Sequence, residues 1–137
     1  MTPQYKAKKP SGDNFPWVRW RAVEGRTAEE LACRYLREQG MLIVARNWRW
    51  RGGEVDIIAK DGSTLVFVEV KGRADEGFAL PEEAVDAGKR ARLWRTAQAY
   101  LAGKPTVPVR FDVVAVTPRG IRHIKGAFTA EDVRAGA

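Results

Sequence analysis

The chain has 137 residues, of which 45% are hydrophobic and 30% are charged, a balance that fits one globular domain with its own core. Its 24 lysines and arginines exceed its 17 aspartates and glutamates, and the net charge of +7 favours polyanionic partners, nucleic acid before anionic membranes. The single cysteine, Cys33, excludes an internal disulfide. No apolar run approaches the ~18 residues of a membrane span and no signal peptide is visible, so we expect a cytoplasmic protein.

Residues 1–24 differ in composition from the rest of the chain, with three prolines and five basic against two acidic residues. They show no sustained hydrophobic period, so we expect a flexible basic extension ahead of a domain over residues 25–137. Phe15, Trp17 and Trp20 either pack on that domain or stack on bases. Packing is the favoured interpretation, because large aromatic side chains are more often docked than functional.

Hydrophobic periodicity from residue 25 onward predicts an alternation of helices and strands. Helices are expected over residues 27–40 and 81–101, strands over residues 41–45, 54–59, 64–71, 107–116 and 121–128, and a last helical turn over residues 129–133. Asp61 and Gly62 give a strong hairpin signal between the second and third strands, and residues 46–53 are expected to cross the surface. This order predicts an α/β fold with an αβββαβ core and one extra strand, a mixed sheet flanked by helices.

The central hairpin carries an unusual group of charged side chains. Side chains alternate between the two faces of a strand, so Glu54 and Asp56 share one face of the second strand. Glu69 and Lys71 share one face of the third strand for the same reason. The expected turn would pair Asp56 with Phe67 and Glu54 with Glu69. All four charged side chains would then project from one face, with Asp56 and Glu69 as diagonal neighbours ~7–8 Å apart.

Three carboxylates among valines and isoleucines repel one another, and acidic residues are almost never fully buried unless they are paired. A divalent cation resolves this conflict, because carboxylates, backbone oxygens and waters suit octahedral Mg²⁺ or Mn²⁺. Zinc is a poor candidate with one cysteine and one histidine far apart in the chain. The alternative is that Glu69 and Lys71 form an ordinary ion pair on an exposed edge.

Asp56, followed by Glu69-Val70-Lys71 within this order of elements, resembles the PD-(D/E)XK nuclease superfamily with its restriction-endonuclease-like fold. The segments GRTAEELACRYLREQG, ARNWRWRGGEVDIIA, LVFVEVKGR and VRFDVVAV are similar to the YraN family (UPF0102) of predicted bacterial nucleases, which are similar to archaeal Holliday junction resolvases. The resemblance covers residues 25–116. The chain departs from the pattern at residue 28, an alanine where the family has glycine, and at residue 55, a valine where the superfamily has proline.

The resemblance implies a role for each residue of the motif. Asp56 and Glu69 would hold Mg²⁺ or Mn²⁺, with the carbonyl of Val70 as a further ligand. Lys71 would act on the attacking water or on the scissile phosphate. Glu29 would complete the metal site from the first helix; its alternative role is a helix-start charge that interacts favourably with the helix dipole. Glu54 is expected at the rim of the site.

Basic residues around this motif are candidates for contacts with nucleic acid. They are Arg46, Arg49, Arg51, Arg73, Lys89, Arg92 and Arg95. An extended chain at residues 46–51 would place Trp48 and Trp50 on the face of Arg46, and we expect these tryptophans to cover the edge of the core. Lys89 is expected nearest the acidic group, because its helix is entered from the strand that bears Lys71.

Two further polar residues have competing interpretations. Asp112 is expected to form a local ion pair or anchor a loop, with a role in the site as the alternative. His123 is expected on the surface rather than as a general base. The leading hypothesis is a Mg²⁺- or Mn²⁺-dependent endonuclease acting on DNA, with branched or damaged forms as candidate substrates and a homodimer by analogy with resolvases. The alternatives are a non-catalytic nucleic-acid-binding module and an interaction subunit of a repair complex.

Overall fold

The computed structural model describes residues 26–72, 86–117 and 119–136. In chain order its elements are α1 (Arg26–Glu38), β1 (Leu42–Trp50), β2 (Gly53–Asp61), β3 (Thr64–Gly72), α2 (Ala87–Leu101), β4 (Val109–Thr117), β5 (Gly120–Phe128) and α3 (Ala130–Gly136). The predictions for residues 1–24, with their three aromatic side chains, and for residues 81–85 lie outside the described residues. None of the described helices has the length and apolar character needed to cross a membrane.

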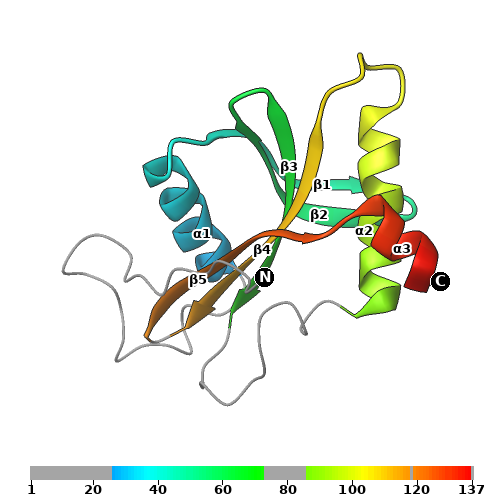
Figure 1. Ribbon diagram of the computed structural model, residues 1–137. Coiled ribbons are helices and arrows are strands. Elements are labelled where there is room, and N and C mark those ends of the chain that lie inside the picture. Colours follow the sequence, from blue (N-terminus) through cyan, green and yellow to red (C-terminus); the bar gives the residue numbers. More distant parts are fainter. Residues whose placement is uncertain (1–25, 73–85, 118, 137) are drawn as a thin grey trace.

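The strands form one sheet in the order β1-β2-β3-β4-β5, in which only the β3–β4 pair is parallel. α1 covers one face of this sheet, and α2 and α3 cover the other (Figure 1). The predicted mixed sheet flanked by helices is therefore confirmed. Because helices cover both faces, β3 and β4 are apolar on both sides, which explains their nearly continuous hydrophobic runs.

Each face of the sheet has its own core. The core under α1 includes Leu31, Tyr35, Leu36, Ile57, Val68, Val114 and Ile121. The core under α2 is built around stacked rings, with Phe111 lying 5.8 Å from Phe67 and 4.7 Å from Phe128 between ring centroids. Cys33 of α1 is itself buried in the core under that helix as a small apolar side chain.

One predicted boundary is wrong. β1 does not end at residue 45 but continues to Trp50, because its second half pairs with β2 up to the Trp50–Gly53 pair. Within the described residues α2 begins at Ala87, where the Asp86 side chain caps it by accepting a hydrogen bond from the Lys89 amide at 2.9 Å. The other predicted strands agree with the structure within two residues.

A buried polar network joins α1, β4 and β5. The Asp112 carboxylate is completely buried and accepts hydrogen bonds from Arg110 Nε at 2.9 Å, from His123 Nε2 at 2.8 Å and from the Gly126 amide at 3.0 Å. The other imidazole nitrogen, Nδ1, lies 3.2 Å from the Tyr35 hydroxyl of α1. Asp112 therefore anchors the fold through a local ion pair with Arg110, which was one of the roles expected for it.

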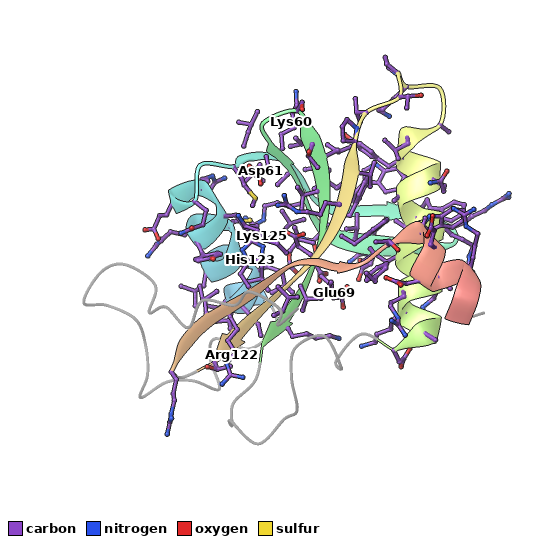
Figure 2. The ribbon with its side chains drawn as sticks, viewed as in Figure 1. Lys60, Asp61, Glu69, Arg122, His123 and Lys125 are labelled. Atoms are coloured by element: carbon purple, nitrogen blue, oxygen red, sulfur yellow. The ribbon has the colours of Figure 1, made fainter. Side chains whose placement is uncertain are left out.

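The expectation that His123 lies on the surface is wrong. It is only 2% exposed and extends from β5 into the side of the sheet that α1 covers (Figure 2). Burial is tolerated here because both ring nitrogens have partners. Sequence alternation could not show this, since the partners come from α1 and β4.

Replacing Asp112 with alanine should lower the free energy of unfolding by about 3–5 kcal/mol, because Arg110, His123 and the Gly126 amide lose their buried acceptor. Although burial alone would raise the pKa of Asp112, the hydrogen bonds from His123, Arg110 and Gly126 hold it below its usual value. The stabilisation is thus present at neutral pH and is lost as the pH falls through that lowered pKa. Urea unfolding followed by circular dichroism measures both effects.

The control is Asp61→Ala, which removes a partly exposed carboxylate that pairs with the same arginine at 2.9 Å. A pair of this exposure contributes at most about 1 kcal/mol. Equal losses for the two variants would contradict the structural role assigned to Asp112.

Candidate active site

The regular alternation of β2 is interrupted at Asp56. Val55 belongs to the core under α2, whereas Ile57, two residues later, belongs to the core under α1. The facing strand is irregular at the same level, where Asn47 has a positive φ of 51° between the Arg46–Ile57 and Trp48–Val55 pairs. The Asp56 side chain is consequently directed toward β3, where its Oδ2 accepts a hydrogen bond from the Val70 amide at 2.8 Å.

The predicted pairing of the β2–β3 hairpin is wrong by two residues. Phe67 lies opposite Ile58 rather than Asp56. The last pair of the hairpin is Asp61–Thr64, so the loop consists of residues 62 and 63, with Gly62 at a φ of 61°. A shift of two keeps the parity of the strands. Continuing this register brings Asp56 level with Glu69, closer than the expected diagonal arrangement.

The carboxylates of this site come from three elements. The pKa of Asp56 is raised to about 7 by burial first, and then by the negative charges of Glu69, Glu29 and Glu54, against the opposing hydrogen bond from Val70. Glu29 reaches this cluster from the first turn of α1. One of its carboxylate oxygens, Oε1, is buried and has no hydrogen-bond partner among the described residues. These carboxylates thus lie close enough together to disfavour the ionised form of Asp56.

Two lysines lie beside this acidic group. Lys71 Nζ is 3.3 Å from Glu69 Oε2, and both side chains are largely shielded from solvent. The amine of Lys89, in the first turn of α2, interacts with that of Lys71. This contact, partial burial and the charge of Lys71 together hold the pKa of Lys89 below its usual value. Lys89 therefore lies at the acidic group, where the connection from β3 to α2 was expected to bring it.

A cavity of about 270 Å³ opens between the hairpin and α2 at this place. Its lining consists of Gly53, Glu54, Asp56, Glu69, Lys89, Arg92 and Leu93. Figure 2 shows Glu69 between α1 and α2 in that view. The cavity has carboxylates on the hairpin side and cations on the helix side. This arrangement suits a ligand that carries a divalent cation on one side and a phosphate group on the other.

The remaining basic candidates are not gathered at this cavity. Arg49 is exposed and pairs with Glu54 at the rim, with 2.7 Å between Nε and Oε2. Arg51 lies in the exposed turn after β1, and Arg95 is exposed on α2 outside the cavity lining. Arg46 lines a different cavity, against α1, and Arg73 lies outside the described residues.

The two tryptophans of β1 support the core, as expected. The Trp48 ring meets the Tyr100 ring edge to face, with 5.2 Å between centroids, and Trp50 Nε1 donates to Thr96 Oγ1 at 3.0 Å. The expectation that Arg46 shares a face of β1 with the tryptophans is wrong. Asn47, with its positive φ, interrupts the alternation of side chains, so Arg46 and Trp48 lie on opposite faces.

Sequence reasoning missed two residues that shape the cavity. Gly53 has a φ of 152°, and an added Cβ there would lie 3.0 Å from Thr96 Oγ1, so glycine lets β2 approach α2 closely. Asp86 fixes the start of α2 and thereby the position of Lys89. Its sequence signal was present, since an aspartate directly before a helical segment is typical of an N-cap.

The chemistry of the donor set decides whether the site fits a divalent cation. Within the described residues, no group of three or more His, Cys, Asp or Glu side chains is arranged to hold a metal ion. Mg²⁺ requires fewer protein ligands, since one or two carboxylates with waters often suffice. The raised pKa of Asp56 and the unpartnered oxygen of Glu29 are what a site built around a missing positive charge would show. The residues present therefore fit a hard divalent cation.

Comparison with known proteins places these residues within one region of sequence similarity. The model of a family described as "Uncharacterised protein family UPF0102" matches residues 28–116. A UPF0102 protein of Dechloromonas aromatica (strain RCB) is 46% identical over 110 residues, which cover 80% of this chain and 92% of that protein. For a UPF0102 protein of Nocardia farcinica (strain IFM 10152) the identity is 51% over 111 residues, with coverages of 76% and 87%. The matched region includes every residue that lines the acidic cavity.

In EDTA, the free energy of unfolding should rise when the pH is lowered from about 8 to about 5. The folded protein holds the pKa of Asp56 at about 7, above the ordinary 3.8, so ionisation of this carboxyl opposes folding. The gain should amount to a few kcal/mol, since one pKa unit corresponds to about 1.4 kcal/mol. Urea titrations across this pH range measure it.

Asp56→Asn should remove most of this pH dependence and stabilise the metal-free protein above pH 7, because asparagine keeps an acceptor for the Val70 amide without the charge. Asp61→Asn, the same change on the same strand, should leave the profile unaltered. A wild-type protein that only loses stability on mild acidification would show that Asp56 is not held in an unfavourable charged state.

Proposed function

This chain belongs to the uncharacterised protein family UPF0102, and we propose that it is a Mg²⁺- or Mn²⁺-dependent endonuclease that hydrolyses phosphodiester bonds in DNA. The observation that carries the proposal is the meeting of Asp56, Glu69 and Lys89 at one cavity, with Lys71 beside both Glu69 and Lys89. Carboxylates alone would repel a phosphate, and lysines alone would bind it without activating it. The combination suits a reaction in which both a cation and a phosphate must be held.

The proposal extends to the fold. The order α-β-β-β-α-β, with Asp56 on β2 and Glu69 and Lys71 on β3, supports a restriction-endonuclease-like core of the PD-(D/E)XK superfamily. In that arrangement the chain continues beyond the core with β5 and α3. The +7 net charge favours a nucleic-acid substrate over a small phosphate ester.

Asp56 and Glu69 would hold the divalent cation, with the carbonyl of Val70 as a third oxygen donor. When bound, the cation supplies Lewis-acid polarisation of the phosphate and lowers the pKa of water. Glu29 lies close enough to raise the pKa of Asp56, so its charge also favours a cation at this place. These three carboxylates belong to α1, β2 and β3, so correct packing of α1 is a condition for the complete site.

The cationic side chains would act on the phosphate. Lys71 is oriented by its ion pair with Glu69, and its ammonium group would donate to a phosphate oxygen as negative charge builds there. Lys89 and Arg92 line the α2 side of the cavity and would position the same phosphate. Cutting both strands of a symmetric substrate would require two such sites and hence two copies of the chain.

Asp56→Asn should abolish metal-dependent cleavage and leave DNA affinity equal or slightly higher, because one negative charge near phosphate is removed. The assay presents single-stranded, duplex, flapped and four-way DNA with Mg²⁺, Mn²⁺ or EDTA. Divalent ion should also raise the melting temperature of the wild type in a concentration-dependent way, and the variant should not respond.

The matched control is Asp61→Asn, which changes a carboxylate on the same strand that pairs with Arg110 outside the cavity. It should cut at the wild-type rate. Binding of DNA without cleavage of any substrate would favour the alternative of a non-catalytic binding module. Failure to bind a protein partner after deletion of residues 1–24, with the metal response unchanged, would favour an interaction subunit.

Lys71→Met should lower kcat by about 10²–10³-fold with a smaller effect on KM, because the ammonium group acts mainly on charge that develops in the transition state. Lys89→Met should have a smaller effect on kcat and a larger one on affinity. Arg95→Met removes an exposed cation from the same helix outside the cavity and serves as the control. Cleavage by Lys71→Met at the wild-type rate would exclude the role given to Lys71.

A further inference from the structure

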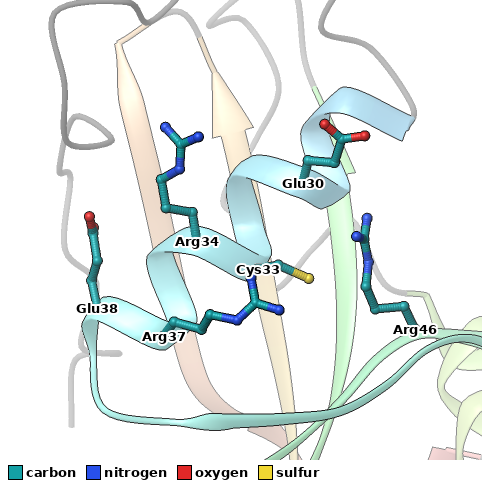
Figure 3. Close-up of a pocket in the computed structure, with 6 residues that line it drawn as sticks. All are labelled: Glu30, Cys33, Arg34, Arg37, Glu38 and Arg46. Carbon is teal, nitrogen blue, oxygen red and sulfur yellow. The ribbon is translucent and has the colours of Figure 1, made fainter.

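A second cavity, of about 560 Å³, lies between α1 and β1 on the face of the sheet that α1 covers (Figure 3). Its lining consists of Glu30, Cys33, Arg34, Arg37, Glu38 and Arg46. Five of these six residues are charged and three are arginines, so the cavity suits an anionic ligand rather than an apolar one. Nothing in the site described above uses its arginines.

Two of the arginines lie on either side of Cys33 in this cavity. Figure 3 shows the guanidinium group of Arg37, from α1, extending toward the Cys33 sulfur, while the side chain of Arg46, from β1, lies on the other side of that sulfur and extends toward Glu30. Electrostatics agrees with this placement: burial raises the pKa of the Cys33 thiol, while the charges of Arg46 and Arg37 oppose that rise. The small, buried Cys33 side chain leaves the space between the two guanidinium groups open.

Arginines outnumber carboxylates in the lining of this cavity. Three of its lining residues are arginines and two are glutamates. The carboxylates are those of Glu30 and Glu38, which leave an excess of one positive charge. The rigid fork of each guanidinium group can bind two oxygens of one phosphate, which a lysine cannot do.

The second cavity adjoins the acidic site at two points. Cys33 follows Glu29 by four residues on α1, one helical turn and a rise of ~6 Å. Arg46 pairs across the sheet with Ile57, the neighbour of Asp56. A nucleic-acid strand held at the acidic site would therefore have further phosphates within reach of this cavity, since one strand carries a charge about every 3.4 Å of helix axis.

We propose that the cavity between α1 and β1 is a phosphate-binding subsite, in which Arg37 and Arg46 clamp a phosphate group of the nucleic-acid strand beyond the bond to be cut, with Arg34 at its side. This inference rests on the proposed nuclease function, because it assigns the phosphate to the substrate. It gives the enzyme two anchoring points on one strand, and the distance between them fixes which bond meets Asp56 and Glu69.

The test is the double variant Arg37→Gln/Arg46→Gln in the full chain. Both side chains are exposed enough for the protein to fold without them, and a thermal melt verifies this. A fluorescent oligothymidylate, with and without a 5′-phosphate, is titrated in EDTA at several salt concentrations. The affinity should fall, and the slope of log affinity against log salt should become shallower by about 0.7 for each phosphate that the variant no longer binds.

The control is Arg134→Gln, which removes one arginine charge from α3 on the opposite face of the sheet. Its salt slope should stay at the wild-type value. A gain in affinity from the 5′-phosphate that only the wild type shows would assign a terminal phosphate to the subsite. A decrease in the affinity of the double variant that is equal for both oligonucleotides would assign an internal one.

Two outcomes would overturn the inference. A double variant with the salt slope of the Arg134→Gln control would show that the cavity does not contact the strand. The second outcome is seen in the arginine Nε–Hε resonances of the wild type. If inorganic phosphate shifts them and oligothymidylate does not, the cavity binds a free anion. Cleavage is measured in a separate assay. If the wild type cuts DNA and the double variant binds DNA as the wild type does, the phosphate subsite is excluded and the nuclease proposal stands. If the wild type binds DNA through the arginines but never cuts it, the nuclease proposal is excluded.

Discussion

The parallel pairing of β3 with β4 is the constraint on which the rest of the site depends. Two parallel neighbours cannot be joined by a tight turn, so the chain between them must cross one face of the sheet. The crossing chain contains α2, whose first turns consequently lie at the end of β3 that carries Glu69 and Lys71. The meeting of Lys89 with Lys71 is thus a consequence of topology.

Electrostatics then explains why this end of the sheet differs from the remainder. Elsewhere the buried charge is satisfied internally, as in the network of Asp112, Arg110 and His123. At Asp56 the fold instead concentrates carboxylates from three elements and leaves a buried oxygen of Glu29 without a partner among the described residues. Such an arrangement lowers stability in the absence of a cation, and proteins retain it where a ligand offsets that destabilisation.

In the proposed function, the two cavities would bind one substrate from different sides of the sheet. The one beneath α2 combines carboxylates with Lys89 and Arg92, which suits chemistry at a phosphate. The one beneath α1 offers arginines without the central carboxylate pair, which suits binding alone. Their connection runs through Glu29 and Cys33 on one helix and through Ile57 and Asp56 on one strand. If the proposed strand binds both cavities, α1 would link its position to the integrity of the acidic site.

The sequence by itself determined the element types and the mixed sheet with helices on it. It also determined that Asp56, Glu69, Lys71 and Lys89 lie together. Periodicity and strand order are local properties, so these predictions hold despite a two-residue error in the register of the hairpin. Tertiary structure alone decided three matters. The irregularity at Asn47 and Asp56 turned one carboxylate toward β3 and separated Arg46 from the tryptophans. His123 became buried because its partners lie on α1 and β4. Arg37 and Arg46 met at one cavity because α1 packs across β1, a contact that no spacing within either segment encodes.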